Sequence, residues 1–397
     1  MKDNKYFFIL LAAIFSIVIY FHAFIKEIAY SPFSDFGNYW LNSTMLKEGF
    51  NPWLSDSQSN TERAKLVKQH NFLIPGPPIN SLGLISFMQI FTIFDYRLSA
   101  ILWMILGHIA LLLSLWIILS FARVKPTLED LFLVLFLVFS FWPMRETLHI
   151  GQVCFLTLLF IAASLYFIKL EKWFLAGILL SLAIQTKEYL IIATLVFILK
   201  KNWKILIGII IGIFLVKLIT IIMFGWNLEL SYWKRMFYFG KEINPSINNH
   251  NLLSTIFRIG KTYLGSLFCG VLSIVLIIIL TSLAIFWTHK TKDLLLSFFP
   301  FLVLPFIISP WIHEAHYIIL YPAIISIWFY IGERNRFNYY VLFILSYILL
   351  GSRYSFMNFP LFHSGMLGIL TTGKLAGVII LFMLSGILAY EDKTKCA

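Results

Sequence analysis

Asp35 is the first residue of this chain whose type and position suggest chemistry. It follows the apolar stretch 7–25 and opens the run Asp-Phe-Gly-Asn-Tyr-Trp that ends at Trp40. A carboxylate just outside a membrane-spanning stretch can act as a general base on a substrate held at the membrane surface. Residues 35–47 are also expected to form an amphipathic helix with Ser34 as its N-cap, so Asp35 could instead only complement the dipole of that helix.

A second group of polar residues interrupts apolar stretches in the middle of the chain. Arg145, Glu146 and Gln152 lie between two such stretches, where ionisable side chains are costly and therefore candidates for function. The alternative is a plain ion pair between Arg145 and Glu146. Lys187 stands between two apolar helices with almost no polar spacer, so we expect it to bind an anion, either the adjacent Glu188 or a phosphate.

The segment 225–262 combines aromatic residues with amides and an arginine. Asn249, Asn251 and Arg258 are the polar candidates in this segment. Sugar hydroxyls and phosphates need many directional hydrogen bonds, which amide and guanidinium groups supply. The aromatic residues alone would more often indicate a belt at the membrane interface.

A later segment, 309–317, places two histidines around an acid. His313 and His316 are three residues apart, with Glu314 between them, so the two rings could share a face. Metal sites of this kind need a third ligand, and the sequence offers none nearby. A hydrogen-bonding or acid–base role is therefore favoured over metal binding.

The composition identifies the class of protein that must position these residues. The chain has 397 residues, 60% of them hydrophobic and only 13% charged, with a mean hydropathy of +0.85. These values indicate an all-α polytopic membrane protein. The net charge of +12 falls mostly in short loops, which favours a positive-inside bias over nucleic-acid binding. The three cysteines are scattered and predict neither a disulfide framework nor a zinc site.

The apolar stretches predict about twelve transmembrane helices in a single domain, 1–397. The stretch 79–94 is expected to lie shallow or to dip in and return, because full crossing would place basic loops such as 123–125 on inconsistent faces. Both termini are then cytoplasmic. The main outer loops are 26–97, with a second polar helix at 61–70, and 225–262. The expected spans are 7–25, 98–121, 128–143, 151–168, 173–186, 188–200, 204–224, 263–287, 294–309, 317–332, 338–351 and 367–390.

Taken in chain order, these residues resemble the C-type glycosyltransferase (GT-C) fold and, within it, family 87. The resemblance covers roughly residues 30–320, and the chain departs from the family pattern at Asn251, Ser254 and Ala315. The matching positions are Asp35-Phe36 with Tyr39, Gly49 to Pro52, Pro77-Pro78, Gly151-Gln152, Gly177 to Lys187, Asn249 to Arg258, Ser309-Pro310, Glu314 and His316.

This resemblance implies an inverting hexosyltransferase that moves a mannose-like sugar from a polyprenyl phosphate to a lipid or glycan acceptor. The active site would face outward from the plasma (inner) membrane, and no cofactor is implied, a divalent metal being the alternative. Asp35 would be the catalytic base and His316 would orient a substrate. The implied donor-binding residues are Lys187, Arg145, Gln152, Asn249, Asn251 and Arg258, and the implied acceptor or interface residues are Tyr39, Trp40 and Glu314.

Two other functions compete with this one. A transporter or flippase for a lipid or small solute would place polar residues near the bilayer midplane and would often contain inverted repeats, and the sequence has no evident repeat. An enzyme similar to the O-antigen ligases would depend on arginines and a histidine in a late loop instead of a carboxylate after the first span.

Overall fold

The architecture comes from a computed structural model, which describes residues 2–30, 33–54, 56–70, 78–120, 127–241, 243, 245–354, 359–363 and 365–392. Every regular element in these ranges is a helix, which confirms the all-α class. Pro77, the basic loop 123–125 and Cys396 lie outside the described residues.

The first half of the chain forms α1 (Lys2–Tyr30), α2 (Ser34–Lys47), α3 (Ser57–His70), α4 (Leu82–Met88), η1 (Gln89–Ile93), α5 (Tyr96–Ser120), α6 (Leu128–Phe139), α7 (Trp142–Ile150), α8 (Cys154–Lys169) and α9 (Trp173–Thr186). The second half forms η2 (Glu188–Thr194), α10 (Leu195–Leu199), α11 (Trp203–Phe224), α12 (Trp226–Lys241), α13 (Leu252–Lys290), α14 (Leu294–Ile308), η3 (Glu314–Leu320), α15 (Tyr321–Arg334), α16 (Phe337–Gly351), η5 (Pro360–Phe362), η6 (Met366–Thr372) and α17 (Gly373–Asp392).

Several of these helices can cross a membrane. Among the described residues, six are long and apolar enough, and the pair α6 and α7, bent by 52°, would make a seventh. The protein is therefore a multi-pass membrane protein. Twelve full-length spans are not confirmed, because the helices at four of the other expected positions, α8, α9, α14 and α16, have only 14 to 16 residues each. The six full-length candidates are Phe7–Glu27, Tyr96–Ser120, Trp203–Phe224, Leu252–Lys290, Glu314–Arg334 and Leu367–Glu391.

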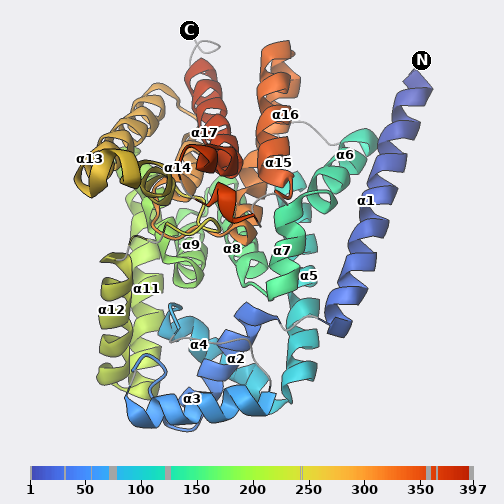
Figure 1. Ribbon diagram of the computed structural model, residues 1–397. Helices are drawn as coiled ribbons and strands as arrows, with labels where there is room; N and C mark the ends of the chain where they lie inside the picture. The colour runs from blue at the N-terminus through green and yellow to red at the C-terminus, as the bar shows by residue number, and fades with distance from the viewer. Residues whose placement is uncertain are drawn as a thin grey trace.

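The short helices occupy the centre of the bundle. In Figure 1, α8 and α9 lie in the middle of the molecule, α2 to α4 lie beneath them, and both chain termini are at the top. Nearly all of α14 and most of α8 are buried. A helix enclosed by protein can end at membrane depth, because neighbouring segments or a polar cavity satisfy its terminal backbone groups. The positions where α7 and α9 end are therefore where polar residues can gather.

Helices α9 and α11 approach each other through glycines. A Cβ atom on Gly177 would lie 2.2 Å from the carbonyl oxygen of Ile205, and one on Gly208 would lie 2.3 Å from that of Phe174. Small residues at a helix crossing let the two backbones pack closely in a membrane. This crossing fixes the direction of α9, and hence the position of Lys187 at its C-terminal end.

The helix α2, in the predicted outer loop 26–97, differs from its prediction in two respects. The N-cap of α2 is Phe33, with φ 46° and no capping side chain, so the prediction that Ser34 caps the helix is wrong. The helix is also not a surface helix with one exposed face, because most of its side chains are buried and it packs against α4, η1 and α5. Trp40, for example, packs edge-to-face on Tyr96. The predicted polar helix at 61–70 is confirmed as part of α3.

Candidate active site

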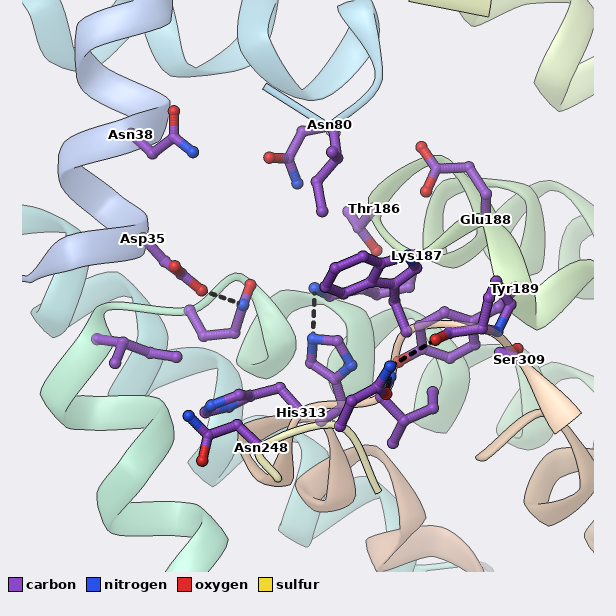
Figure 2. Close-up of a pocket in the computed structure, with 18 of the residues that line it drawn as sticks. Asp35, Asn38, Asn80, Thr186, Lys187, Glu188, Tyr189, Asn248, Ser309 and His313 are labelled. Carbon is purple, nitrogen blue, oxygen red and sulfur yellow. Dashed lines mark hydrogen bonds between the residues drawn. The ribbon is translucent and has the colours of Figure 1, made fainter. Parts of the chain in front are cut away.

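A cavity of about 610 Å³ lies between α2, the C-terminal ends of α7 and α9, and the loops that precede α13 and η3. Polar side chains from segments far apart in the sequence point into it (Figure 2). Six of the eleven residues to which the family resemblance assigns a role line this cavity: Asp35, Tyr39, Gln152, Lys187, Asn249 and His316.

Asp35 enters the cavity from the first turn of α2 and meets Gln152 there. The Gln152 amide nitrogen donates a hydrogen bond to Oδ2 of Asp35. Gln152 follows Gly151, which ends α7 in the left-handed conformation (φ 69°). A Cβ atom on Gly151 would lie 2.7 Å from Cβ of Phe36, so only glycine fits both the turn and the contact with α2. The Trp103 indole fixes the same turn by donating to the Gly151 carbonyl at 2.9 Å.

The environment of Asp35 changes its acidity. Removal of the carboxyl from bulk water raises its pKa above the ordinary value of 3.8. The positive charges of Lys187 and His313 and the hydrogen bond from Gln152 act in the opposite direction. Asp35 remains half-buried because the open cavity reaches it. Its place in the first turn of α2 also complements the helix dipole, so this structural role and a chemical one coexist.

Lys187 is the cationic group of the cavity. It stands between α9 and η2 in an extended conformation (φ −144°, ψ 92°), and its side chain is largely buried. Its ammonium group forms no ion pair with a carboxylate in the described part of the chain. The adjacent Glu188 accepts a hydrogen bond from the Tyr232 hydroxyl at 2.7 Å, so it is not the partner that the sequence offered as one alternative. The charge of Lys187 is therefore left facing the cavity (Figure 2).

His316 is the direct partner of Lys187. The ammonium donates to Nε2 of His316 at 3.0 Å. A ring nitrogen that accepts a hydrogen bond carries no proton, so the imidazole is neutral and its proton is on Nδ1. The ring lies 5.7 Å from that of Tyr189, centroid to centroid, and Nδ1 has no hydrogen-bond partner among the residues that the structure describes. The pair thus presents an ammonium group to the cavity, next to a neutral ring whose Nδ1 is buried.

Asn249 and Asn251, the two asparagines singled out in the segment 225–262, hold loops together. The Asn249 side-chain oxygen accepts from the backbone of Ile312 at 2.9 Å, and its nitrogen donates to the Pro310 carbonyl at 2.7 Å. The Asn251 side chain caps α13 by accepting from the backbone of Ser254 at 2.7 Å. Asn249 therefore lines the cavity with an amide that the protein already uses, and Asn251 lies outside the lining.

Two other candidates lie beside the cavity, where they contact Trp142. The Arg145 guanidinium stacks 5.1 Å from the Trp142 ring, and Glu314 accepts from the indole nitrogen at 3.1 Å. Glu314 also pairs with the buried Lys374 at 3.3 Å. Neither Arg145 nor Glu314 lines the cavity.

Arg258 and Trp40 are also absent from the cavity lining. Arg258 is buried and donates to the backbone oxygen of Ser246 at 3.0 Å, which supports the loop before α13. Trp40 belongs to the hydrophobic core. These positions show that polarity or aromaticity alone did not identify which residues reach the cavity.

Among the lining residues absent from the predicted set of ligands are Glu146, Asn38 and Asn80. Glu146 points into the cavity and forms no ion pair with Arg145 in the described structure, since adjacent residues of a helix face different directions. Asn38 and Asn80 add amides on the side of α2 (Figure 2). Asn38 lies three residues after Asp35 on α2, a spacing that places both on one helix face and could have predicted it.

Metal ligands do not gather in this cavity. Within the described ranges, no three His, Cys, Asp or Glu side chains come close enough together to hold a metal ion. His313 and His316 both line the cavity, but His316 is committed to Lys187.

A helical membrane bundle that holds a carboxylate and an unpaired ammonium in one cavity is suited to group transfer on an anionic, membrane-bound substrate. Comparison with known families agrees, because the sequence model of Glycosyltransferase family 87 matches residues 79–310, more than half of the chain. The chain belongs to this family and is a membrane glycosyltransferase, which confirms the resemblance noted in the sequence. Comparisons with curated proteins and with solved structures give no match.

The family match covers only part of the cavity. Gln152, Lys187 and Asn249 lie inside the matched residues, whereas Asp35 and His316 lie outside them. The fold brings the two sets together, since Gln152 contacts Asp35 and Lys187 contacts His316.

Proposed function

We propose that this glycosyltransferase moves a hexose, mannose-like in its stereochemistry, from a polyprenyl phosphate to a hydroxyl of a lipid or glycan acceptor. The observation that carries the proposal is that Asp35 and Lys187 face one cavity without pairing with each other. A carboxylate there can take a proton, and a separate ammonium can receive a phosphate. Both groups are needed when a sugar leaves a phosphate and bonds to an alcohol.

The proposed reaction is a single displacement. Asp35 accepts the proton of the acceptor hydroxyl while that oxygen bonds to the anomeric carbon of the sugar. The bond between this carbon and the phosphate oxygen breaks at the same time, and the polyprenyl phosphate leaves with the electron pair. Because the hydroxyl attacks opposite the leaving phosphate, the configuration at the anomeric carbon is inverted.

The phosphate is assigned to the side of the cavity that holds Lys187 and His316. Negative charge grows on the phosphate as the bond breaks, and the Lys187 ammonium, held by His316, can stabilise it. Positive charge is therefore supplied by the protein, and we propose that no cofactor is needed. Asn38, Glu146 and Asn248 line the side nearer Asp35 and would contact acceptor hydroxyls.

The setting in the membrane belongs to the same proposal. We assign the chain the GT-C fold, with the short helices completing about twelve spans and with 26–97 and 225–262 outside. The cavity would then open to the outer face of the plasma membrane, where a lipid-linked donor can enter from the bilayer. The basic loops, which favour the opposite face, support this orientation.

A transfer assay tests the function. The purified protein, reconstituted in liposomes, is given radiolabelled polyprenyl-phosphate sugars, including mannose and glucose, with a glycan or lipid acceptor. We expect labelled product with inverted anomeric configuration, unaffected by a metal chelator. Label that crosses the membrane without product would support a transporter, and transfer only from a nucleotide sugar or a polyprenyl diphosphate would overturn the proposed donor.

A further inference from the structure

The Gln152 side chain is held in one orientation by two donors. The Tyr39 hydroxyl and the backbone nitrogen of Val153, the latter at 3.0 Å, both donate to the Gln152 side-chain oxygen. If the Gln152 amide were turned over, the Val153 N–H would face the amide nitrogen and Asp35 would face the amide oxygen, so both of these contacts would be lost. The nitrogen must therefore face Asp35, to which it donates.

This arrangement leaves the two oxygens of Asp35 with different roles. Oδ2 accepts from Gln152, whereas Oδ1 accepts no hydrogen bond from the described residues. The carboxylate thus has one oxygen anchored to the protein and one turned to the cavity. A general base needs such an arrangement, because the atom that takes the proton must point at the substrate.

We propose that Gln152 is a positioning residue of the transferase, held by Tyr39, that aims the Asp35 carboxylate and keeps it charged instead of binding the donor sugar or phosphate. This inference rests on the proposed function of Asp35 as the base. It gives Gln152 and Tyr39 roles that differ from the ligand-binding roles expected from the sequence.

The electrostatic consequence follows from the groups around Asp35. Lys187 at the end of α9 and His313 before η3 favour the charged carboxylate, as does the hydrogen bond from Gln152. Glu146 on α7 also interacts with Asp35 and, being acidic, disfavours a second negative charge. Tyr39 and Cys154 also interact with the charge of Asp35, and both side chains are themselves neutral. Loss of the donor at Gln152 leaves the others in place, so the pKa of Asp35 must rise.

The test replaces Gln152 with methionine, which has similar length and no hydrogen-bond donor. The acid limb of the pH dependence of kcat/KM should move by about one pH unit to higher pH. At pH values below this limb, kcat should be about tenfold lower than in wild type. The KM for the donor should stay within about twofold of wild type. Tyr39→Phe should move the limb in the same direction by less. This variant removes one of the two hydrogen bonds that hold the Gln152 amide but leaves the amide itself beside Asp35. Gln89→Met, outside the cavity, is the matched control and should change neither quantity.

A tenfold rise in donor KM with an unmoved limb would overturn the inference and support direct substrate binding by Gln152. No change in either quantity would overturn it as well, since the hydrogen bond would then have no effect on Asp35.

A readout without turnover separates this inference from the proposed function. The ionised Asp35 opposes folding, so the gain in thermal midpoint from Asp35→Asn should rise with pH and level off above the folded-state pKa. In the Gln152→Met background this gain should level off at a higher pH and a larger value. If the wild-type protein transfers no sugar yet this shift is seen, the proposed function fails and the positioning role stands. If the curves coincide, the positioning role fails whatever the activity.

Discussion

Replacing Lys187 with methionine removes the one lysine or arginine charge among the described residues that line the cavity. The ammonium is largely buried, and its direct partner is the neutral ring of His316. Two unit charges about 4 Å apart attract by about 4 kcal/mol at an effective dielectric constant of about 20. Desolvation of both groups offsets part of this energy. We expect Lys187→Met to lose about 2–3 kcal/mol of transition-state stabilisation, so kcat/KM should fall about 30- to 160-fold.

The assay is sugar transfer from a polyprenyl-phosphate donor at several donor concentrations. Lys187→Arg keeps the charge and should retain more activity than Lys187→Met. Lys204→Met, an exposed lysine at the start of α11, is the matched control and should behave as wild type. The thermal midpoint of Lys187→Met should change little, because the variant loses the attraction between Lys187 and Asp35 but no longer buries an ammonium group. A Lys187→Met enzyme within threefold of wild-type kcat/KM would refute the phosphate assignment.

Three further predictions follow from the site and its supports. Burial raises the pKa of Asp35 above 3.8, and a base works only when it is deprotonated. In the measured pH profile, kcat/KM should therefore fall as the pH drops through this raised pKa. Gly208→Ala should force α9 and α11 apart and cost about 1–3 kcal/mol or more, measured as a lower thermal midpoint in detergent. Asn249→Ala should also lower that midpoint, because Ile312 loses the acceptor of its buried N–H, which costs about 1–3 kcal/mol of the free energy of unfolding.

The sequence was sufficient for the class of fold and for the position of the acid. Apolar stretches separated by basic loops predict a helical membrane protein, and six long helices agree with that. It was not sufficient for the lengths of the central helices. Apolar runs such as 188–200 read as one span, whereas they form a 3₁₀ segment and a short helix, η2 and α10, whose ends the surrounding protein encloses.

The partners of the site residues were not predictable where they come from distant parts of the chain. Lys187 has one acidic neighbour in sequence, Glu188, but in the structure that carboxylate accepts a hydrogen bond from Tyr232. The contact between Gln152 and Asp35 joins residues that are 117 positions apart, and nothing in either local sequence specifies it.

Residues that bind within their own loops were the least predictable. An amide or guanidinium group has the same chemistry whether it meets a ligand or a backbone carbonyl. Asn251 and Arg258 make such internal contacts, and only the folded loops distinguish them from residues that face the cavity.

The central claim is that Asp35 is the base of a transfer from a polyprenyl-phosphate sugar. Asp35→Asn keeps the size of the side chain and removes the charge, so the protein should fold with a thermal midpoint at neutral pH equal to or above that of wild type. We predict that this variant still binds the donor but loses kcat by about 100- to 10,000-fold in the liposome assay. A correctly folded Asp35→Asn protein that transfers sugar at the wild-type rate would contradict the account.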